Sequence, residues 1–504
     1  MDFKKIWSGV QFAKIGLSSK AISVINPDLG RSYLIRSLSE MPGIPAKMGQ
    51  LFTSKYGIKD VIQPKAMPLE TVRRILGEDS PRLAEKIIRI EEVAHPASLG
   101  QVHRVELDDG SEAAIKVQYP GVRTEVLSQL DIMLSGFETV GFSKNYGFDT
   151  VAYREFLSGN FKQELDYRLE AKKQDEIFGL WSSDLDVVVP KPDLTYSSAN
   201  VLLQTFESSE STEIVAESYD KETKIRMAKL LAKAFLKSVL TVKRIQTDMH
   251  TGNYGFRPIE GQIVLYDFGS TIDITSHHAQ ILAYFSNSSG KFSSSKKAFD
   301  ALVALGFDPK LLIHLGESLG SLVNLIFEPF ETDPWTPKTW NLLDRMEKLL
   351  GSEKWWFRSA GPPWFLFLMR TAHGLMHALS LLDVDIDLRS LFLEILNENP
   401  VLGKPPLLLP ISDSYEFKEL NEGQRSKRLK VLVTESGTTL VEMTMPARAV
   451  EDLENLVSDE TRLRIEADGY DLEKIKKNAL DSDLAPQTLF ESALMEKKYR
   501  VWLE

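Results

Sequence analysis

The sequence predicts an α+β protein with two lobes, a small lobe rich in β-strands and a larger helical lobe. Alternating apolar and polar residues mark strands within residues 86–206, into which helices are inserted, whereas the helical period dominates residues 207–410. A helical extension at residues 1–85 precedes the lobes. A stretch with Pro, Gly and polar residues near 400–423 separates them from a small α+β appendage at residues 424–504.

The composition is that of a globular protein and excludes several kinds of site. The chain has 504 residues, of which 43% are hydrophobic and 26% charged. A net charge of −11 argues against a nucleic-acid partner, which would favour a basic protein. The chain has no cysteine, so structural disulfides and thiolate zinc sites are excluded.

The N-terminal extension and the small lobe show a clear change of period. We expect helices at residues 34–41, 46–56 and 68–76, and Gly77 is expected to end the last of these. Strands are expected at residues 87–92, 101–107 and 112–118. Asp109 and Gly110 are typical of a tight hairpin turn between the last two strands.

The remaining elements follow in order along the chain. We expect long helices at 123–140 and 153–178, strands at 185–189 and 201–206, a helix at 221–242, a strand at 262–266 and mostly helices over 275–400. In the appendage, a hairpin is expected at 429–434 and 439–445, and Pro446 is expected to open a helix.

No secretory signal or membrane span is expected. The most apolar run, residues 362–369, is interrupted by Arg370 and falls short of the roughly 20 residues that cross a bilayer. We expect it to be a buried helix of the larger lobe. The first forty residues carry a mild basic excess, best explained as a solvated helical face, with contact to an anionic membrane as the alternative. We therefore expect a cytoplasmic protein, with peripheral membrane contact as a further option.

Three ordered motifs carry the chemistry of the chain. Lys116 lies on a short apolar strand, Asp248 precedes Asn253 by five positions, and Asp267-Phe-Gly follows another apolar strand. A strand lysine, an Asp with a following Asn, and an Asp-Phe-Gly, in this order, are the working parts of a protein-kinase-like ATP site. Each motif alone is weak, but their order makes chance agreement improbable.

These residues supply what bound Mg-ATP requires. Lys116 can place a cation on the phosphates, and Asn253 and Asp267 can supply the hard oxygen ligands that Mg²⁺ prefers. Asp248 can orient or deprotonate an acceptor hydroxyl. The alternative for Asp248 and Asn253 is a turn-forming pair, and Asp267 could cap a helix.

The segment before the lysine strand departs from the usual phosphate loop. Residues 94–103 contain one glycine, Gly100, and Ala97 and Ser98 stand where a flexible turn is expected, so this loop should be stiffer. We expect Ala97 and Ser98 to contact the nucleotide, together with Phe206 and Glu207 at the end of the strand 201–206.

Over roughly residues 30–400 the chain resembles the UbiB/AarF atypical kinase family, proteins linked to coenzyme Q and isoprenoid-lipid metabolism. The resemblance is carried by four motifs, Lys47-Met-Gly-Gln50, Pro96-Ala-Ser-Leu-Gly-Gln101, Lys116-Val-Gln-Tyr-Pro-Gly121 and Glu164-Leu-Asp166. The family's His-x-Asp-Pro-His-Pro-Gly-Asn appears as Gln246-Thr-Asp-Met-His-Thr-Gly-Asn253, so both prolines are absent while Asp, Gly and Asn remain.

The resemblance implies roles for residues outside the kinase motifs. It places Lys47 and Gln50 on a helix across the mouth of the ATP cleft. Glu155 and Glu164 are both candidates to pair with the strand lysine, while Glu164 and Asp166 are alternatively implied to engage Lys47 or a metal.

The resemblance implies an atypical kinase or ATPase that uses ATP and Mg²⁺ near quinone or isoprenoid-lipid metabolism. Its partners would be a nucleotide and lipid or quinone-pathway small molecules or enzymes, with no nucleic acid. Two alternatives stay open. One is a pseudokinase-like module that binds nucleotide and regulates a partner. The other is a small-molecule phosphotransferase, which would not need the Lys47 motif.

Overall fold

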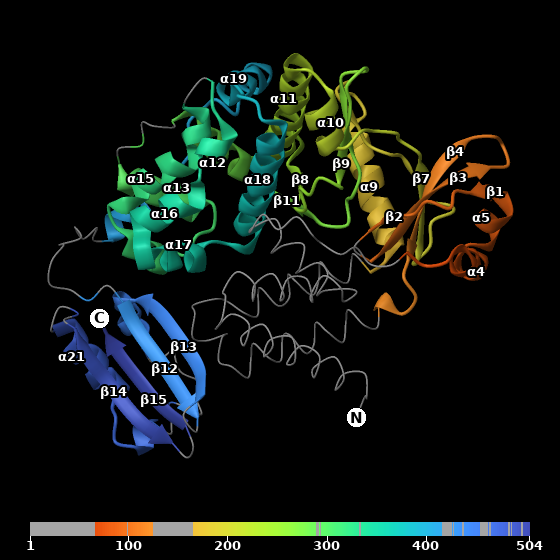
Figure 1. Cartoon of the computed structure of the whole chain (residues 1–504). Helices are drawn as coiled ribbons and strands as arrows, with labels where there is room; N and C mark the ends of the chain where they lie inside the picture. Colours follow the sequence, from red (N-terminus) through yellow and green to blue (C-terminus); the bar gives the residue numbers. More distant parts are fainter. Residues whose placement is uncertain are drawn as a thin grey trace.

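Figure 1 shows the computed structural model of the chain. The structure describes residues 66–97, 99–123, 165–288, 292, 294–331, 334–415 and, with short gaps, 426–504. The helices expected at 34–41 and 46–56, nearly all of the one at 123–140 and the first part of the one at 153–178 lie outside the described residues.

The small lobe is built on a six-stranded antiparallel sheet in the order β1-β3-β4-β7-β6, with β2 paired to β3. Its strands are β1 (Ile87–Ile90), β2 (His95–Pro96), β3 (Gly100–Leu107), β4 (Glu112–Gln118), β6 (Pro192–Asp193) and β7 (Val201–Thr205). The turn between β3 and β4 forms where Asp109 and Gly110 predict it, since Gly110 has φ +79° and donates to the Leu107 carbonyl.

Helices cover both sides of this sheet. α4 (Leu69–Asp79) and α5 (Pro81–Lys86) pack through Val72, Leu76 and Leu83 onto an apolar cluster that includes Ile115 and Val117 of β4. α9 (Tyr167–Trp181) packs against β6 and β7. The expectation that Gly77 ends the helix predicted at residues 68–76 is wrong. α4 continues through it to Asp79, because an exposed helical glycine costs only about 1 kcal/mol relative to alanine.

Two small sheets begin the larger lobe. β5 (Val187–Val188) pairs in parallel with β10 (Gln262–Leu265), which pairs antiparallel with β9 (Tyr254–Arg257). β8 (Arg244–Gln246) pairs with β11 (Thr271–Asp273). These short strand pairs position residues 247–253 and 266–270, the two segments that carry the predicted chemistry.

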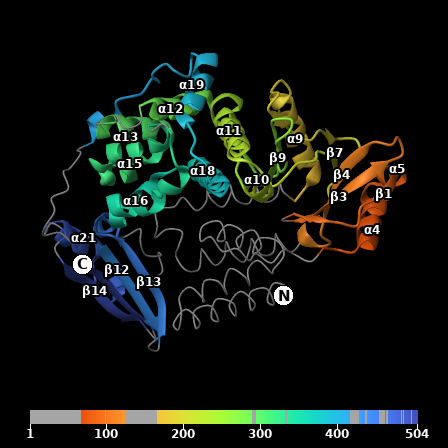
Figure 2. The same cartoon turned by 45° about the horizontal axis from the view of Figure 1, so that its top comes forward.

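Helices make up the rest of the larger lobe. They are α10 (Thr212–Ser218), α11 (Lys221–Lys237) with the π-helical turn η1 (Ser238–Val242), α12 (Ser276–Asn287), α13 (Ser295–Ala304), α14 (Pro309–Leu312), α15 (Ser318–Phe327), α16 (Leu342–Leu350), α17 (Lys354–Ala360), α18 (Pro363–Leu382) and α19 (Leu388–Glu398). Short 3₁₀ turns link several of them: η2 (Ile313–Leu315), η3 (Glu328–Phe330), η4 (Pro337–Thr339), η5 (Gly351–Glu353) and η6 (Ile411–Ser414). In Figures 1 and 2, α10 and α11 lie between the small lobe and the other helices.

α18 corrects the expectation of a short apolar run. The helix spans 20 residues and continues through Arg370, whose side chain forms an ion pair with Asp248. By length and composition α18 is apolar enough to cross a membrane, and α14 with α15 meets the same test only as a pair bent by 92°. α18 packs against α10 and α11, so it is a helix of the larger lobe.

The C-terminal residues form a sheet whose strands pair with one another. The order is β13-β12-β15-β14, from β12 (Arg428–Glu435), β13 (Thr438–Pro446), β14 (Gln487–Leu494) and β15 (Lys497–Leu503). Between β13 and β14 the chain forms η7 (Ala447–Asp452) and α21 (Leu472–Asp481). The segment after Pro446 is a 3₁₀ helix. Glu451 contacts the larger lobe, 3.7 Å from His314.

Candidate functional site

Lys116 is held on the central part of the small-lobe sheet. It pairs with Val102 of β3 and Leu202 of β7, so the backbone beneath its side chain is fixed on both sides. The side chain is only 13% exposed, and its Nζ lies 2.6 Å from Oε1 of Glu170 and 3.7 Å from Oδ2 of Asp267. The lysine therefore joins the small lobe, α9 and the Asp-Phe-Gly segment of the larger lobe.

The surroundings of Lys116 keep it charged. Burial acts to lower its pKa, but the carboxylates of Asp267 and Glu170 act in the opposite direction, and the net pKa lies well above the usual lysine value. Its Nζ also lies 4.9 Å from the centre of the Tyr167 ring, and burial raises the pKa of that tyrosine. A permanently charged ammonium suits a position that must hold phosphate oxygens.

Glu170 is the partner of Lys116 that the sequence analysis missed. Glu155 and Glu164 lie outside the described residues, whereas Glu170 is 3% exposed on the buried face of α9. That face recurs at helical spacing, as Tyr167, Glu170, Ala171, Gln174, Ile177 and Trp181. The signal for Glu170 was a carboxylate at a position of the helix that is otherwise mostly apolar. A buried carboxylate needs a charged or hydrogen-bonding partner.

Asp166 has a local role at the start of α9. Its side chain accepts a hydrogen bond from the backbone N–H of Arg168 and caps the helix. It also forms an ion pair of 2.8 Å with the Arg168 guanidinium, and the hydrogen bond from that side chain lowers the pKa of Asp166. The described contacts of Asp166 are thus local, while Glu164 and Lys47, its implied companions, lie outside the described residues.

The β9–β10 hairpin brings Asn253 and Asp267 together. Leu265 pairs with Tyr254, and the Tyr266 N–H donates to the Asn253 carbonyl at 2.9 Å. Asp267 follows directly, so the two predicted metal ligands leave the same end of the hairpin. Oδ1 of Asp267 accepts the Gly269 N–H at 2.9 Å, and its Oδ2 faces Lys116.

Asn253 is oriented by the loop that precedes it. Its Nδ2 donates to the backbone carbonyl of Asp248 at 2.9 Å, and its own N–H donates to the His250 carbonyl. The amide nitrogen is thereby engaged, which leaves the amide oxygen for a cation. Asp248 and Asn253 do form a turn, as the alternative interpretation expected, and this turn orients the amide oxygen of Asn253.

The carboxylate of Asp248 is held by an arginine far away in sequence. Nη2 of Arg370, on α18, lies 2.7 Å from Oδ1 of Asp248, and both side chains are partly exposed. Gly374 on the same helix lets the loop approach, because a Cβ there would lie 2.4 Å from the Met249 carbonyl oxygen. The second oxygen of Asp248 is left for another partner.

The loop before β3 is a tight turn. The Ala97 N–H donates to the Gly100 carbonyl at 2.8 Å, and the Tyr119 N–H donates to the Leu99 carbonyl at 3.0 Å. Gly100 is required by packing, because a Cβ would lie 2.2 Å from the Val117 carbonyl oxygen. The only glycine of this loop thus permits strand contact and gives the turn itself no added freedom.

Phe206 and Glu207 lie on the segment that joins β7 to the larger lobe. The Glu207 carbonyl accepts the Tyr266 hydroxyl at 2.7 Å, and its carboxylate pairs with Arg257 at 2.7 Å. The Phe206 ring lies 4.5 Å from the Arg104 guanidinium. This connecting segment is therefore fixed to β9 and to the residue before Asp267.

The structure brings together the predicted residues of the kinase motifs. Lys116 and Asp267 are in contact, Asn253 and Asp248 share one loop, and Ala97, Phe206 and Glu207 lie on segments adjoining β3, β7 and Tyr266. Lys47, Gln50, Ser98 and Glu164 lie outside the described residues. Glu170 and Arg370 are the two additions.

The donor set of the site fits Mg²⁺ bound with nucleotide phosphates. No cluster of three or more His, Asp or Glu side chains among the described residues could hold a metal unaided. Mg²⁺ bound with a nucleotide takes one or two protein oxygens and completes its shell with phosphates and water. Asp267 and the amide oxygen of Asn253 supply such a pair, beside the ammonium of Lys116.

A lysine on a small antiparallel sheet that pairs with a glutamate on an adjoining helix and faces an Asp-Phe-Gly of a helical lobe is the arrangement of protein kinases. The predicted protein-kinase-like α+β fold is confirmed. A solved structure titled as the complex of Rv3197 with erythromycin, from Mycobacterium tuberculosis, aligns with 77% of this chain and 100% of its own, at TM-score 0.51 and 19% identity.

Residues 64–290 match the family described as the ABC1 atypical kinase-like domain. The mitochondrial atypical kinase COQ8 of Saccharomyces cerevisiae is 26% identical over 319 residues, covering 59% of this chain and 62% of that protein. The mitochondrial atypical kinase COQ8B of Danio rerio is 24% identical, covering 55% and 47% respectively. Over this domain the expected resemblance to the UbiB/AarF atypical kinase family is confirmed, and the chain matches less than two thirds of the length of these relatives.

Proposed function

We propose that the chain binds Mg-ATP and acts as an atypical kinase or ATPase. The observation that carries this proposal is the position of Lys116 between the carboxylates of Glu170 and Asp267. Glu170 orients the ammonium toward the phosphates, and Asp267 with Asn253 would hold the magnesium that neutralises them. Magnesium would supply electrostatic stabilisation of the transferring phosphoryl group.

Asp248 would act on the acceptor. Arg370 holds one oxygen of its carboxylate, so the other can accept a proton from an acceptor hydroxyl or orient a water. The Asp248 loop is fixed by Asn253 on one side and by α18 on the other.

The acceptor would be a small molecule of quinone or isoprenoid-lipid metabolism, or water, and not a protein. This part rests on the family resemblance and on the motif at Lys47, which would restrict the mouth of the cleft. Both relatives named above are called mitochondrial. For this chain we propose a cytoplasmic location, with peripheral membrane contact as the alternative.

A weakly active nucleotide-binding module is the second candidate. The tight turn at Ala97, which uses its own N–H, favours it. Such a module would bind ATP through the same residues but would hydrolyse it or transfer its phosphate slowly or not at all.

A turnover assay separates these functions. The full chain is incubated with Mg²⁺ and γ-labelled ATP, alone, with lipid vesicles, with a phenolic compound, or with casein as a generic protein. We expect labelled phosphate to appear in solution or on the small molecule while casein stays unlabelled. Strong labelling of casein would contradict the restricted cleft, and ATP binding without any turnover would favour the regulatory module.

A further inference from the structure

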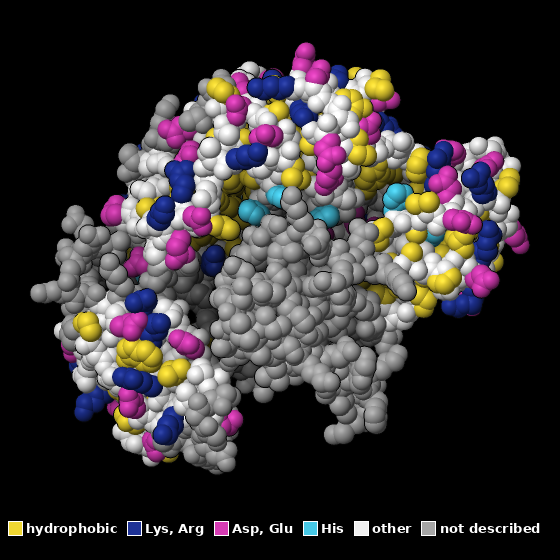
Figure 3. Space-filling view, in the orientation of Figure 1, with side chains coloured by type: hydrophobic (Ala, Val, Ile, Leu, Met, Phe, Trp, Pro, Cys, Tyr) yellow, Lys and Arg dark blue, Asp and Glu magenta, His cyan; other side chains and the backbone are white. Residues whose placement is uncertain are grey.

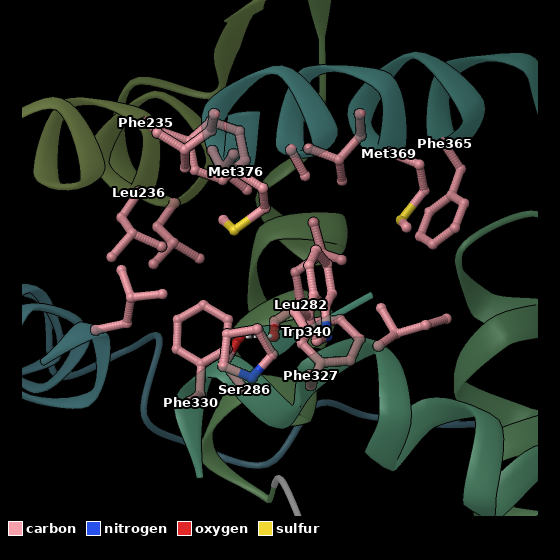
Figure 4. A pocket seen from close by; sticks show the side chains of 18 residues that line it. Phe235, Leu236, Leu282, Ser286, Phe327, Phe330, Trp340, Phe365, Met369 and Met376 are labelled. Atoms are coloured by element: carbon pink, nitrogen blue, oxygen red, sulfur yellow. Dashed lines mark hydrogen bonds between the residues drawn. The ribbon is translucent and has the colours of Figure 1, made fainter. Parts of the chain in front are cut away.

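The larger lobe contains an apolar cavity that the nucleotide chemistry does not use. It has a volume of about 90 Å³ and lies among α11, η1, α12, α15, η3, α18 and α19. Figure 4 shows the aromatic rings of Phe327, Phe330, Trp340 and Phe365 around it, with Met369 and Met376 on the α18 side.

The wall offers a guest no free side-chain hydrogen-bond donor. Eighteen residues line the cavity, and all but Ser286 are apolar or, as with Trp340, largely so. The Ser286 hydroxyl already donates to the Leu282 carbonyl at 3.0 Å, and the Trp340 indole N–H donates to the Leu325 carbonyl at 3.1 Å. A polar guest would lose its hydrogen bonds with water here, so the site selects an apolar one.

The cavity lies on the opposite face of α18 from the nucleotide site. Phe365, Leu368, Met369, Ala372, Leu375 and Met376 line it and recur at helical spacing. Arg370 and Gly374, which contact Asp248 and Met249, occupy the other face of the helix. A guest in the cavity would therefore leave the nucleotide residues untouched.

We propose that this cavity is a second binding site, which takes the end of an unbranched hydrocarbon chain. Its volume is below the roughly 150 Å³ of an engineered apolar cavity that takes up benzene, so it suits a slim chain better than a ring. Met369 and Met376 can change rotamer and widen it, because methionine is unbranched and flexible. An empty apolar cavity also destabilises the fold, so a guest is favoured.

Binding of 1-bromohexane to the full chain tests this proposal. Bromine quenches indole fluorescence at short range, and Trp340 lines the cavity. We expect saturable quenching and a raised melting temperature for the wild type. Trp340→Phe should remove most of the quenching and keep the rise in melting temperature.

Filling the cavity gives the decisive comparison. Ala372→Leu, and Ala372→Val as a milder filling, should abolish or weaken both effects. His373→Leu places the same leucine side chain at an exposed position of the same helix and should leave both unchanged. Absence of saturable binding to the wild type, or undiminished binding to a folded Ala372→Leu variant, would overturn the proposal. Lys116→Ala should keep bromohexane binding, so a failure of the nucleotide proposal would be seen separately.

Discussion

Lys116 shows how one side chain depends on three parts of the chain. β4 fixes its backbone, α9 supplies Glu170, and the segment after β10 supplies Asp267. Because two carboxylates surround it, the ammonium stays charged in a mostly buried position. Bound phosphate would share this charge with the two carboxylates.

Replacement of Lys116 tests its contact with phosphate. Lys116→Ala should weaken ATP binding by about tenfold or more, as expected for loss of a charged hydrogen bond of about 1.5–3 kcal/mol. Lys172→Ala, on the exposed face of the helix that carries Glu170, should change ATP affinity little. Isothermal titration with Mg-ATP measures both. Equal losses of ATP affinity from the two substitutions would show that Lys116 contributes only its positive charge and no direct contact with phosphate.

Arg370 is expected to position Asp248. Arg370→Ala should lower kcat by about ten- to a hundredfold, since small misplacements of a reacting group cost about this much, with little change in KM for ATP. Arg370→Lys should restore part of the rate. A rise in KM with unchanged kcat would instead place Arg370 in nucleotide binding.

The sequence could predict residues whose chemistry is set by local motifs. Lys116, Asp248, Asn253 and Asp267 each stand in a short recognisable segment, and the structure assembles them. Arg370 could not be found in this way, because it lies 122 positions from Asp248 and looks like the polar end of an apolar run. Only the packing of α18 against the loop reveals it.

At the scale of elements, period and turn chemistry predicted most of the small lobe. β4 and β12–β13 match their expected ranges closely, because alternation and turns act locally. The expected helix 221–242 is instead α11 followed by a π-helical turn, since its last residues meet β8 and α12. Such endings depend on tertiary contacts and leave little trace in the sequence.

The contact between β3 and β4 at Gly100 should be sensitive to any side chain. Gly100→Ala places a Cβ against the Val117 carbonyl and should destabilise the protein by about 1–3 kcal/mol. Gly77→Ala, in the exposed part of α4 where a Cβ meets nothing within 4 Å, should stabilise it by about 0.5–1 kcal/mol. Chemical denaturation of the small lobe compares them, and a neutral Gly100→Ala would mean that the strands can separate easily.

On the scale of the whole molecule, acidic and basic side chains are interspersed over both lobes on the face shown in Figure 3. The two lobes are joined through the segment after β7 and by the ion pair between Lys116 and Asp267. Among the described residues, the four strands of the C-terminal sheet form backbone ladders with one another and with no other strand.

We propose that residues 424–504 fold as a separate unit. A chain that ends at residue 423 should remain folded and bind Mg-ATP with nearly unchanged affinity, because the nucleotide residues all lie before Pro400. Truncation removes the Glu451–His314 contact and also apolar side chains, among them Leu429 and Met445, that share a buried cluster with the larger lobe, so it should lower the melting temperature. An insoluble or unfolded truncated protein would show that the larger lobe needs this sheet for its own stability.

The most direct test of the central claim is a thermal shift with Mg-ATP in the wild type and in Asp267→Asn. The substitution keeps the shape of the side chain and removes the charge that would hold magnesium and face Lys116. We predict that Mg-ATP raises the melting temperature of the wild type, that magnesium is required, and that the rise disappears in Asp267→Asn while the ligand-free variant melts close to the wild type. An undiminished rise in the variant would contradict the assignment of this site.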